Sequence, residues 1–186
     1  MSRLVLGMLL GAVLGIAALC PSLLAATSQS STAADSLAPL AALVGRWTGT
    51  TEGQPGKGTV AREYERALNS RFIQVRNRST YPAQEKNPKG EVHEDVGYFS
   101  YDSGRKRIVF RQFHTEGFVN QYVWDPASTA ERIVLVTEAI ENIPAGWRAR
   151  ETYVLTAQDQ LEEIFELAEP GKDFEVYSRN RLTRAR

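Results

Sequence analysis

Few side chains in this 186-residue sequence are of the types that usually do chemistry. The chain has two histidines, His93 and His114, and one cysteine, Cys20. His114 lies in the aromatic-rich segment 110–118, whose side chains could line a pocket. A single histidine on a strand is more often a hydrogen-bonded residue at a pocket rim than a ligand. Because closed zinc sites are built mainly from Cys and His, none is expected here.

Two carboxylates, Glu94 and Asp95, directly follow His93 in the sequence. Neighbouring residues of a strand point to opposite faces of a sheet. We therefore expect no direct pairing of His93 with these carboxylates.

Glutamates are frequent later in the chain, and most are expected on a solvated outer face. Glu151 is the exception, because strand alternation places it on the apolar face of Trp147 and Tyr153. A buried carboxylate needs a partner, and the candidates are Arg76, Arg78 and Arg181. The sequence contains no Gly-x-Ser-x-Gly elbow, phosphate loop or His-Glu-x-x-His motif, so it gives little support for an enzyme.

The N-terminal segment has the pattern of an export signal. Arg3 precedes the uninterrupted apolar run 4–19, and small residues at 24–26 follow Pro21. This run is shorter than the roughly 20 residues of a membrane-spanning helix, so a signal peptide over 1–26 is favoured over a membrane anchor. Lipidation of Cys20 is the other alternative, although Leu19 stands where lipoproteins usually have a small residue. Export predicts a periplasmic or secreted protein with no stable membrane anchor after cleavage.

The charge of the chain is balanced, with 22 basic and 22 acidic residues. No basic stretch is long enough to follow a phosphate backbone, so nucleic acid is not an expected partner. Residues 27–35 are rich in Ser, Thr and Ala and predict a flexible leader. Residues 36–186 are long enough for one domain. The sequence leaves the oligomeric state open.

The organisation of this domain follows from a short helical pattern and many strand patterns. A helix is predicted over 37–44, with Leu37, Leu40, Ala41 and Val44 on one face, and Gly45 ends it. Ten strands are predicted, with short turns that force antiparallel neighbours, over 47–52, 58–68, 71–81, 91–101, 107–115, 118–125, 132–141, 147–156, 160–168 and 174–183. Such strands form a sandwich or a barrel, and a barrel leaves no exposed edges. The predicted fold is all-β: a ten-stranded antiparallel up-and-down barrel with a short N-terminal covering helix.

A Gly-x-Trp pattern opens the first predicted strand at residues 45–47. We expect Trp47 to fill the closed end of the barrel, with direct ligand contact as the alternative. An arginine of the last strand, Arg181 or Arg179, can stack on its ring.

Two segments resemble the nitrobindin-like heme-binding β-barrels, which belong to the calycin superfamily. Residues 37–49 (LAPLAALVGRWTG) resemble the opening of that family. Residues 93–99 (HEDVGYF) resemble its His-x-Glu-x-Gly-Tyr-Leu strand, with Asp95 in place of Glu. The resemblance implies a ten-stranded barrel that can hold heme.

The same resemblance implies an iron-binding histidine on the last strand, and that position holds Tyr177 here. A tyrosinate can hold ferric heme, and Arg179 is expected to lower the pKa of Tyr177 by favouring its anion. The alternative is a pocket that has lost heme, with Tyr177 serving only in packing or hydrogen bonding.

Three functions remain open at this point. The chain is first a binding protein for heme or another small apolar molecule, with Tyr177, Arg179, His114, His93, Trp47 and Glu151 as candidate site residues. The resemblance also implies a heme enzyme that isomerises peroxynitrite to nitrate. The third possibility is a core-filled barrel that acts through its surface.

Overall fold

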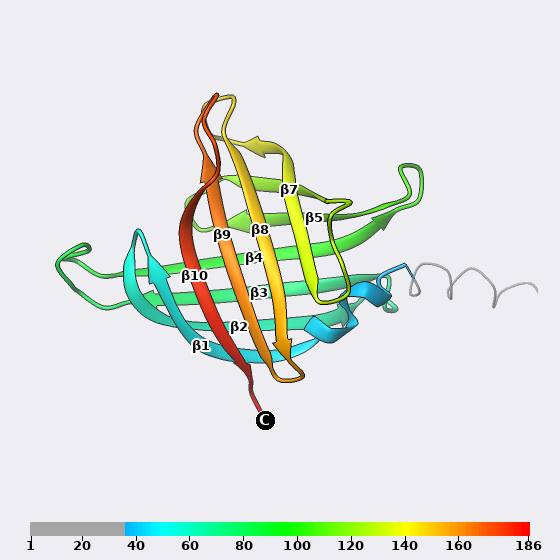
Figure 1. Ribbon diagram of the computed structural model, residues 1–186, viewed down its shortest axis with the longest axis horizontal. Coiled ribbons are helices and arrows are strands. Elements are labelled where there is room, and N and C mark those ends of the chain that lie inside the picture. Colours follow the sequence, from blue (N-terminus) through cyan, green and yellow to red (C-terminus); the bar gives the residue numbers. More distant parts are fainter. Residues whose placement is uncertain (1–35) are drawn as a thin grey trace, which may run out of the picture.

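The computed structural model describes residues 36–186, which form a closed antiparallel barrel (Figure 1). Each strand pairs with its neighbours in sequence, and β1 also pairs with β10 to close the sheet. The strands are β1 (Gly45–Gly53), β2 (Gly56–Ala67), β3 (Phe72–Tyr81), β4 (Glu91–Asp102), β5 (Arg107–His114), β6 (Val119–Trp124), β7 (Arg132–Glu141), β8 (Arg148–Ala157), β9 (Gln160–Ala168) and β10 (Glu175–Arg184). The predicted ten-stranded up-and-down barrel is confirmed. The predicted signal peptide (1–26) and leader (27–35) lie outside the described residues.

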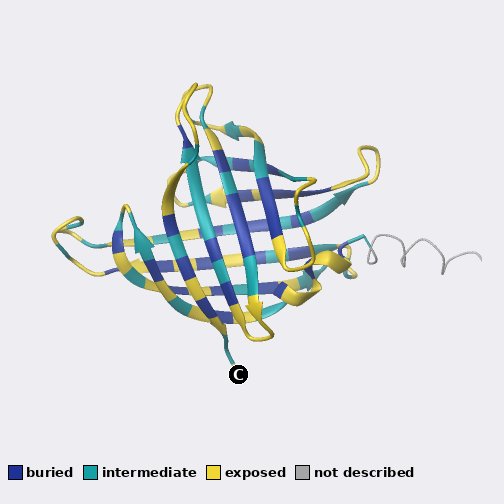
Figure 2. Ribbon diagram, viewed as in Figure 1, coloured by how far each residue is buried: buried dark blue, intermediate teal, exposed yellow. Residues whose placement is uncertain are grey.

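Buried and exposed residues alternate along most strands (Figure 2). In β2, for example, Val60, Arg62 and Tyr64 are buried, while Ala61 and Glu65 face solvent. This alternation follows from the period of two of an extended chain. Within residues 36–186, no helix has the length and apolar character needed to cross a membrane.

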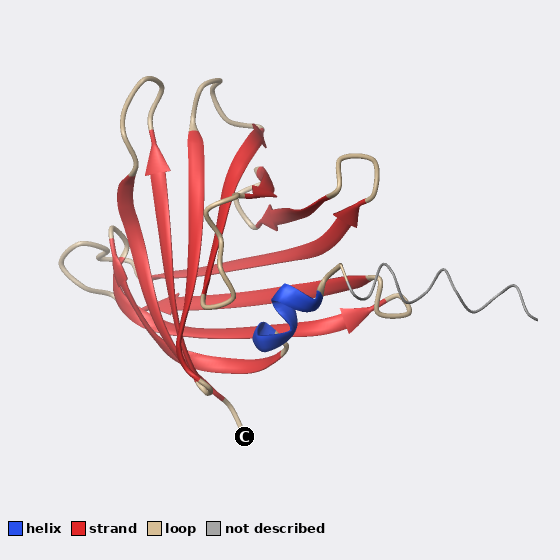
Figure 3. Cartoon of the chain, turned by 45° about the vertical axis from the view of Figure 1, so that its right-hand side comes forward, coloured by secondary structure: helices blue, strands red, loops and turns tan. Residues whose placement is uncertain are grey.

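The predicted covering helix is present only as a short 3-10 helix, η1 (Ala38–Leu43), beside the strands in Figure 3. A 3-10 helix has three residues per turn, so side chains three apart lie in line. Leu37, Leu40 and Leu43 are therefore the buried residues, whereas the predicted Ala41 is exposed. The prediction assumed the 3.6 residues per turn of an α-helix, which places Ala41 on the same face as Leu37 and Leu40. The three residues per turn of a 3-10 helix do not.

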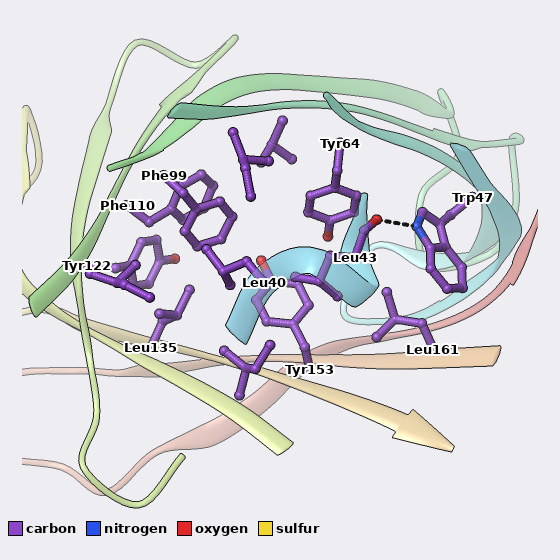
Figure 4. Packing of buried hydrophobic residues seen from close by; sticks show 14 of the residues in the cluster. Leu40, Leu43, Trp47, Tyr64, Phe99, Phe110, Tyr122, Leu135, Tyr153 and Leu161 are labelled. Atoms are coloured by element: carbon purple, nitrogen blue, oxygen red, sulfur yellow. Dashed lines mark hydrogen bonds between the residues drawn. The ribbon is translucent and has the colours of Figure 1, made fainter. Parts of the chain in front are cut away.

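One end of the barrel is packed with large side chains, and we call it the filled end (Figure 4). The leucines of η1 enter it between the strands, and the rings of Phe99 and Phe110 stack with centroids 4.1 Å apart. Gly97 permits this stack, because a Cβ at that position would lie 2.5 Å from the Phe110 ring. The other large buried residues at this end are Trp47, Tyr64, Ile73, Tyr122, Ile133, Leu135, Tyr153, Leu161 and Leu182.

Trp47 occupies the filled end, as predicted, and is completely buried. Its indole Nε1 donates a hydrogen bond to the carbonyl of Leu43 at 2.7 Å. The stacked arginine is Arg184, whose guanidinium lies 4.2 Å from the ring centroid. The prediction of Arg181 or Arg179 was wrong because β10 pairs with β1 in a register that places Arg184 opposite Trp47.

Candidate functional site

The opposite end of the same strands encloses a cavity of about 510 Å³, and we call it the open end. The wall combines the last residues of β3, β5, β7 and β9 with the first residues of β4, β6, β8 and β10. Large apolar residues lie along this wall: Phe118, Ile140, Ile143, Trp147, Phe165 and Leu167. The cavity shows that the described barrel is not filled throughout by its core.

A layer of buried polar residues separates the cavity from the filled end. At its centre, Arg62 Nη1 forms an ion pair with Glu163 Oε1, and both side chains are almost fully buried. Burial opposes the charge of Arg62, but the attraction of Glu163 together with that of other nearby acidic groups outweighs it and raises the pKa of the guanidinium. Asn180 Nδ2 donates to the other oxygen of Glu163 at 3.2 Å. The Glu163 carboxylate is therefore held by Arg62 at one oxygen and by Asn180 at the other.

Glu151 lies beside this ion pair and is also buried. Its carboxyl group accepts hydrogen bonds from the hydroxyls of Tyr153 and, at 3.4 Å, Tyr122. Burial, and next the negative charge of Glu163, raise the pKa of Glu151 to about 8, so the group holds a proton at neutral pH. Its partners are thus tyrosines. The predicted partners lie elsewhere: Arg76, Arg78 and Arg181 are exposed on the outer face.

The two histidines meet at the cavity wall, together with a carboxylate that was not expected to pair. His93 Nε2 lies 3.4 Å from Asp95 Oδ2, and His93 Nδ1 lies 2.8 Å from Glu116 Oε1. The sequence prediction excluded this contact because it treated Asp95, like Glu94, as an immediate neighbour of His93 on the strand. Residues two apart on a strand share a face, however, so His93 and Asp95 both point inward. His114 Nδ1 lies 3.5 Å from His93 Nε2.

The two imidazoles have opposite electrostatic environments. Burial alone would lower the pKa of His93, but hydrogen bonds to Asp95 and Glu116 outweigh it and raise the pKa to about 9. Burial lowers the pKa of His114 to about 4, with a further contribution from the charge of His93. His114 also stacks on Phe118, with ring centroids 4.0 Å apart. At neutral pH the site therefore holds one imidazolium and one neutral imidazole.

Tyr177 lines the cavity because the pairing of β10 with β9 is irregular at this residue. The register shifts between Val176 and Ser178, and Tyr177 and its neighbour Ser178 both face the cavity. Such a bulge redirects a side chain that regular alternation would point outward. Gly53 of β1 permits the arrangement, since a Cβ there would lie 2.1 Å from the Tyr177 carbonyl oxygen.

The pKa of Tyr177 is shifted in the direction opposite to the one expected. Burial, then the charge of Glu91, raise it. Arg179 does not counteract this shift, because its guanidinium points to the outer face and lies 3.7 Å from Glu162 Oε1. The Tyr177 ring also packs edge-on against Phe165, with centroids 5.7 Å apart.

Four of the six candidate site residues line one cavity: Tyr177, His114, His93 and Glu151. Trp47 belongs to the filled end, and Arg179 lies on the outer face. The residues that sequence reasoning missed are Arg62, Asn77, Asp95, Gln112, Asn120, Glu163 and Asn180. These side chains point inward because every second residue of a strand faces the same side. This alternation could have been read from the sequence.

The closed barrel, with a cavity at its open end, has the architecture of a small-ligand-binding barrel. Residues 36–184 match the model of the THAP4-like, heme-binding β-barrel domain. The chain belongs to this family, which confirms the nitrobindin-like resemblance. The search of curated proteins found no match.

A solved structure with the same fold is the crystal structure of Rv2717c from M. tuberculosis. It is 17% identical, has a TM-score of 0.63, and the match covers 81% of this chain and 98% of that chain. At this identity, the likeness supports the barrel fold alone.

Proposed function

We propose that this protein binds heme in the cavity at the open end, with the phenol oxygen of Tyr177 as the ligand of the iron. The observation that carries the proposal is the β-bulge that turns Tyr177 into the cavity beside Ser178. Bulges of this kind are frequent next to functional sites, where they re-aim a side chain. Membership of a heme-binding domain family supports the same ligand.

The cavity suits heme in size and lining. Its volume of about 510 Å³ falls within the roughly 300–1,000 Å³ of small-molecule sites. The apolar side chains at the open end, such as Phe165 and Trp147, offer contacts for a flat macrocycle. A cavity of this size also argues against a core-filled barrel that acts only through its surface.

The charged groups that line the cavity leave a negative excess, which disfavours a negatively charged group at the buried edge of a ligand. Arg62 pairs with Glu163, and His93 pairs with Asp95 and Glu116. Glu151 holds its proton at neutral pH. Carboxylates on a ligand would therefore be better placed toward solvent than in the polar layer.

Tyr177 would hold the iron as a phenolate. Heme supplies a ferric iron that a tyrosinate can bind. Because the surroundings of Tyr177 raise its pKa, the phenol must lose its proton on binding. Affinity for ferric heme is therefore expected to increase with pH.

Titration of the purified protein with hemin, followed by the Soret band, tests the proposal. Tyr177→Phe is expected to weaken binding by more than about tenfold, which corresponds to about 1.4 kcal/mol. Tyr98→Phe is the matched control, because the Tyr98 hydroxyl accepts a hydrogen bond from Gln74 outside the cavity. Loss of binding in His114→Gln, with Tyr177→Phe unaffected, would move the iron ligand to His114. No Soret change in the unmodified protein would refute heme as the ligand.

The proposal includes export, so that binding takes place in the periplasm or outside the cell. Its support is the apolar run 4–19 and the small residues that follow it. Expression in a bacterium and intact-mass measurement of the periplasmic fraction tests this. A mass matching a chain that begins near residue 27 is expected, and a full-length chain retained in the cytoplasm would refute it.

A further inference from the structure

We propose that His93, Asp95 and His114 form a binding site for one divalent transition-metal ion in the wall of the cavity. One donor atom from each residue lies within 4.8 Å of the other two. This inference does not depend on heme, because neither Tyr177 nor the apolar side chains of the cavity wall belong to the cluster.

Two of the three separations between the donor atoms match those around a bound ion. The distance from His93 Nε2 to Asp95 Oδ2 is 3.4 Å, and that from His93 Nε2 to His114 Nδ1 is 3.5 Å. Zinc–nitrogen bonds are about 2.0–2.1 Å long, so two tetrahedral ligands lie about 3.3–3.4 Å apart. An ion could therefore enter between these atoms with only small side-chain movements.

The three ligands come from two strands that pair directly. His93 and Asp95 are two apart on β4 and share its inner face, and His114 on β5 lies opposite Asp95 in the register. Strand pairing fixes the backbone at all three positions. A site built on paired strands is more precise than one built on loops.

Each proposed ligand is already held by a second residue at its other polar atom. His93 Nδ1 lies 2.8 Å from Glu116 Oε1, and Gln112 Nε2 donates to Asp95 Oδ1 at 2.9 Å. A carboxylate behind a histidine, and hydrogen bonds to a ligating carboxylate, are typical of the outer shell of metal sites. These contacts fix the orientation of the ligands, and Asp95 Oδ2 also accepts a hydrogen bond from Asn77 Nδ2 at 2.8 Å, which a bound ion would share or replace.

Asn120 supplies the corresponding contact for His114. Its amide nitrogen lies 3.2 Å from His114 Nε2, while its buried Oδ1 has no hydrogen-bond partner. When Nδ1 binds a metal, Nε2 carries a proton and needs an acceptor. A half-turn of the Asn120 amide provides it, because Oδ1 then faces Nε2.

The type of ligand indicates the type of ion. Two imidazoles and one carboxylate suit Zn²⁺, Fe²⁺ and Co²⁺, whereas Mg²⁺ and Ca²⁺ prefer oxygen ligands. Three protein ligands leave coordination positions open. These positions face the cavity, so a bound ion would be accessible to water or to a ligand held there.

Titration of the chelator-treated, heme-free protein with Co²⁺, followed by visible absorption, tests the site. We expect saturation at one ion per chain, and more than about tenfold weaker binding in His114→Gln and in Asp95→Asn. Glu94→Gln is the matched control for Asp95→Asn, because Glu94 lies next to it on the outer face and pairs with Arg78. Binding to this control is expected to be unchanged.

Absence of saturable binding in the unmodified protein would overturn the proposal, and so would equal affinity in folded His114→Gln. Circular dichroism identifies variants that do not fold. Asp95→Asn then replaces a misfolded His114→Gln, because Asp95 belongs to the first cluster alone. A second cluster, formed by Glu91, His93 and Glu116, shares one residue with the first. Loss of binding in Glu91→Gln but not in His114→Gln would place the ion there and refute the site proposed here.

Discussion

The two ends of this barrel are built on the same ten strands but differ in what fills them. In β8, Tyr153 packs into the filled end, while Glu151, two residues earlier, lines the cavity. In β10, Leu182 joins the core and Tyr177 faces the cavity. Strand pairing is regular over most of the sheet, and the bulge at Tyr177 is one of its three register shifts. Apart from such shifts, the two ends differ in side-chain size and polarity, and this difference separates the residues that stabilise the fold from those available for binding.

The polar layer forms the boundary between the two ends. Its central ion pair joins Arg62 of β2 to Glu163 of β9, and β1 and β10 lie between these two strands in the sheet. Buried pairs of this kind contribute little net stability, because desolvation offsets their attraction. Their hydrogen bonds do fix side-chain positions. The layer thus gives the cavity a rigid polar floor rather than adding much to stability.

The largest expected effect is the difference in stability between two variants, each of which lacks the tryptophan of one end. Trp47→Ala should lower the free energy of unfolding by about 3–5 kcal/mol, because it leaves a cavity in the filled end. Trp147→Ala should cost less than about 1.5 kcal/mol, since that side chain is only partly buried at the open end. Urea denaturation of both variants measures the difference. Equal losses would contradict the assignment of stability to the filled end.

The second prediction concerns pH and the protonated carboxyl of the polar layer. The pKa of Glu151 is raised from 4.5 to about 8 in the folded protein, so the folded chain holds a proton that the unfolded chain releases between these values. The stability that this proton contributes is complete below pH 4.5 and is lost as the pH rises through 8. Glu151→Gln should lack this loss, and the stability of the unmodified protein should fall relative to the variant by up to about 1.4 kcal/mol per pH unit.

Urea midpoints measured between pH 5 and 8.5 test this prediction. The exposed Glu65 of β2 offers a matched control, and Glu65→Gln should leave the pH profile parallel to that of the unmodified protein. If the curves for Glu151→Gln and the unmodified protein were parallel as well, Glu151 would not hold its proton in the fold.

The architecture was predictable because it depends on patterns local in sequence. Period-two alternation and short turns gave ten strands, and turns of that length allow only antiparallel neighbours. The position of Trp47 followed from its place at the start of the first strand. The type of the N-terminal helix was missed, because a six-residue segment with Pro39 near its start satisfies either helical period about equally well.

The details of the cavity were less predictable because they depend on register and on contacts far apart in sequence. Arg62 and Glu163 are 101 residues apart, and no local pattern links them. The bulge at Tyr177 brings this residue and its neighbour Ser178 to the same side, which regular alternation along β10 does not predict. The pairing of His93 with Asp95, by contrast, was accessible, since it needed only the rule that residues two apart share a face.

The smallest expected effect is the difference between substitutions of two arginines of the last strand. It tests the register in which β10 pairs with β1, which the sequence alone left open. Arg184 stacks on Trp47 and donates hydrogen bonds to the carbonyls of Val44 and Ala42 at 2.7 and 2.8 Å. Arg184→Gln should therefore destabilise the protein by about 1–2 kcal/mol. Arg181→Gln removes only an exposed ion pair with Glu52 and should cost less than about 1 kcal/mol. Thermal unfolding at low and high salt distinguishes them, because screening weakens the exposed pair but leaves the contact with the buried ring largely intact. A larger loss in Arg181→Gln would mean that β10 pairs with β1 in a different register and that the filled end is closed by another residue.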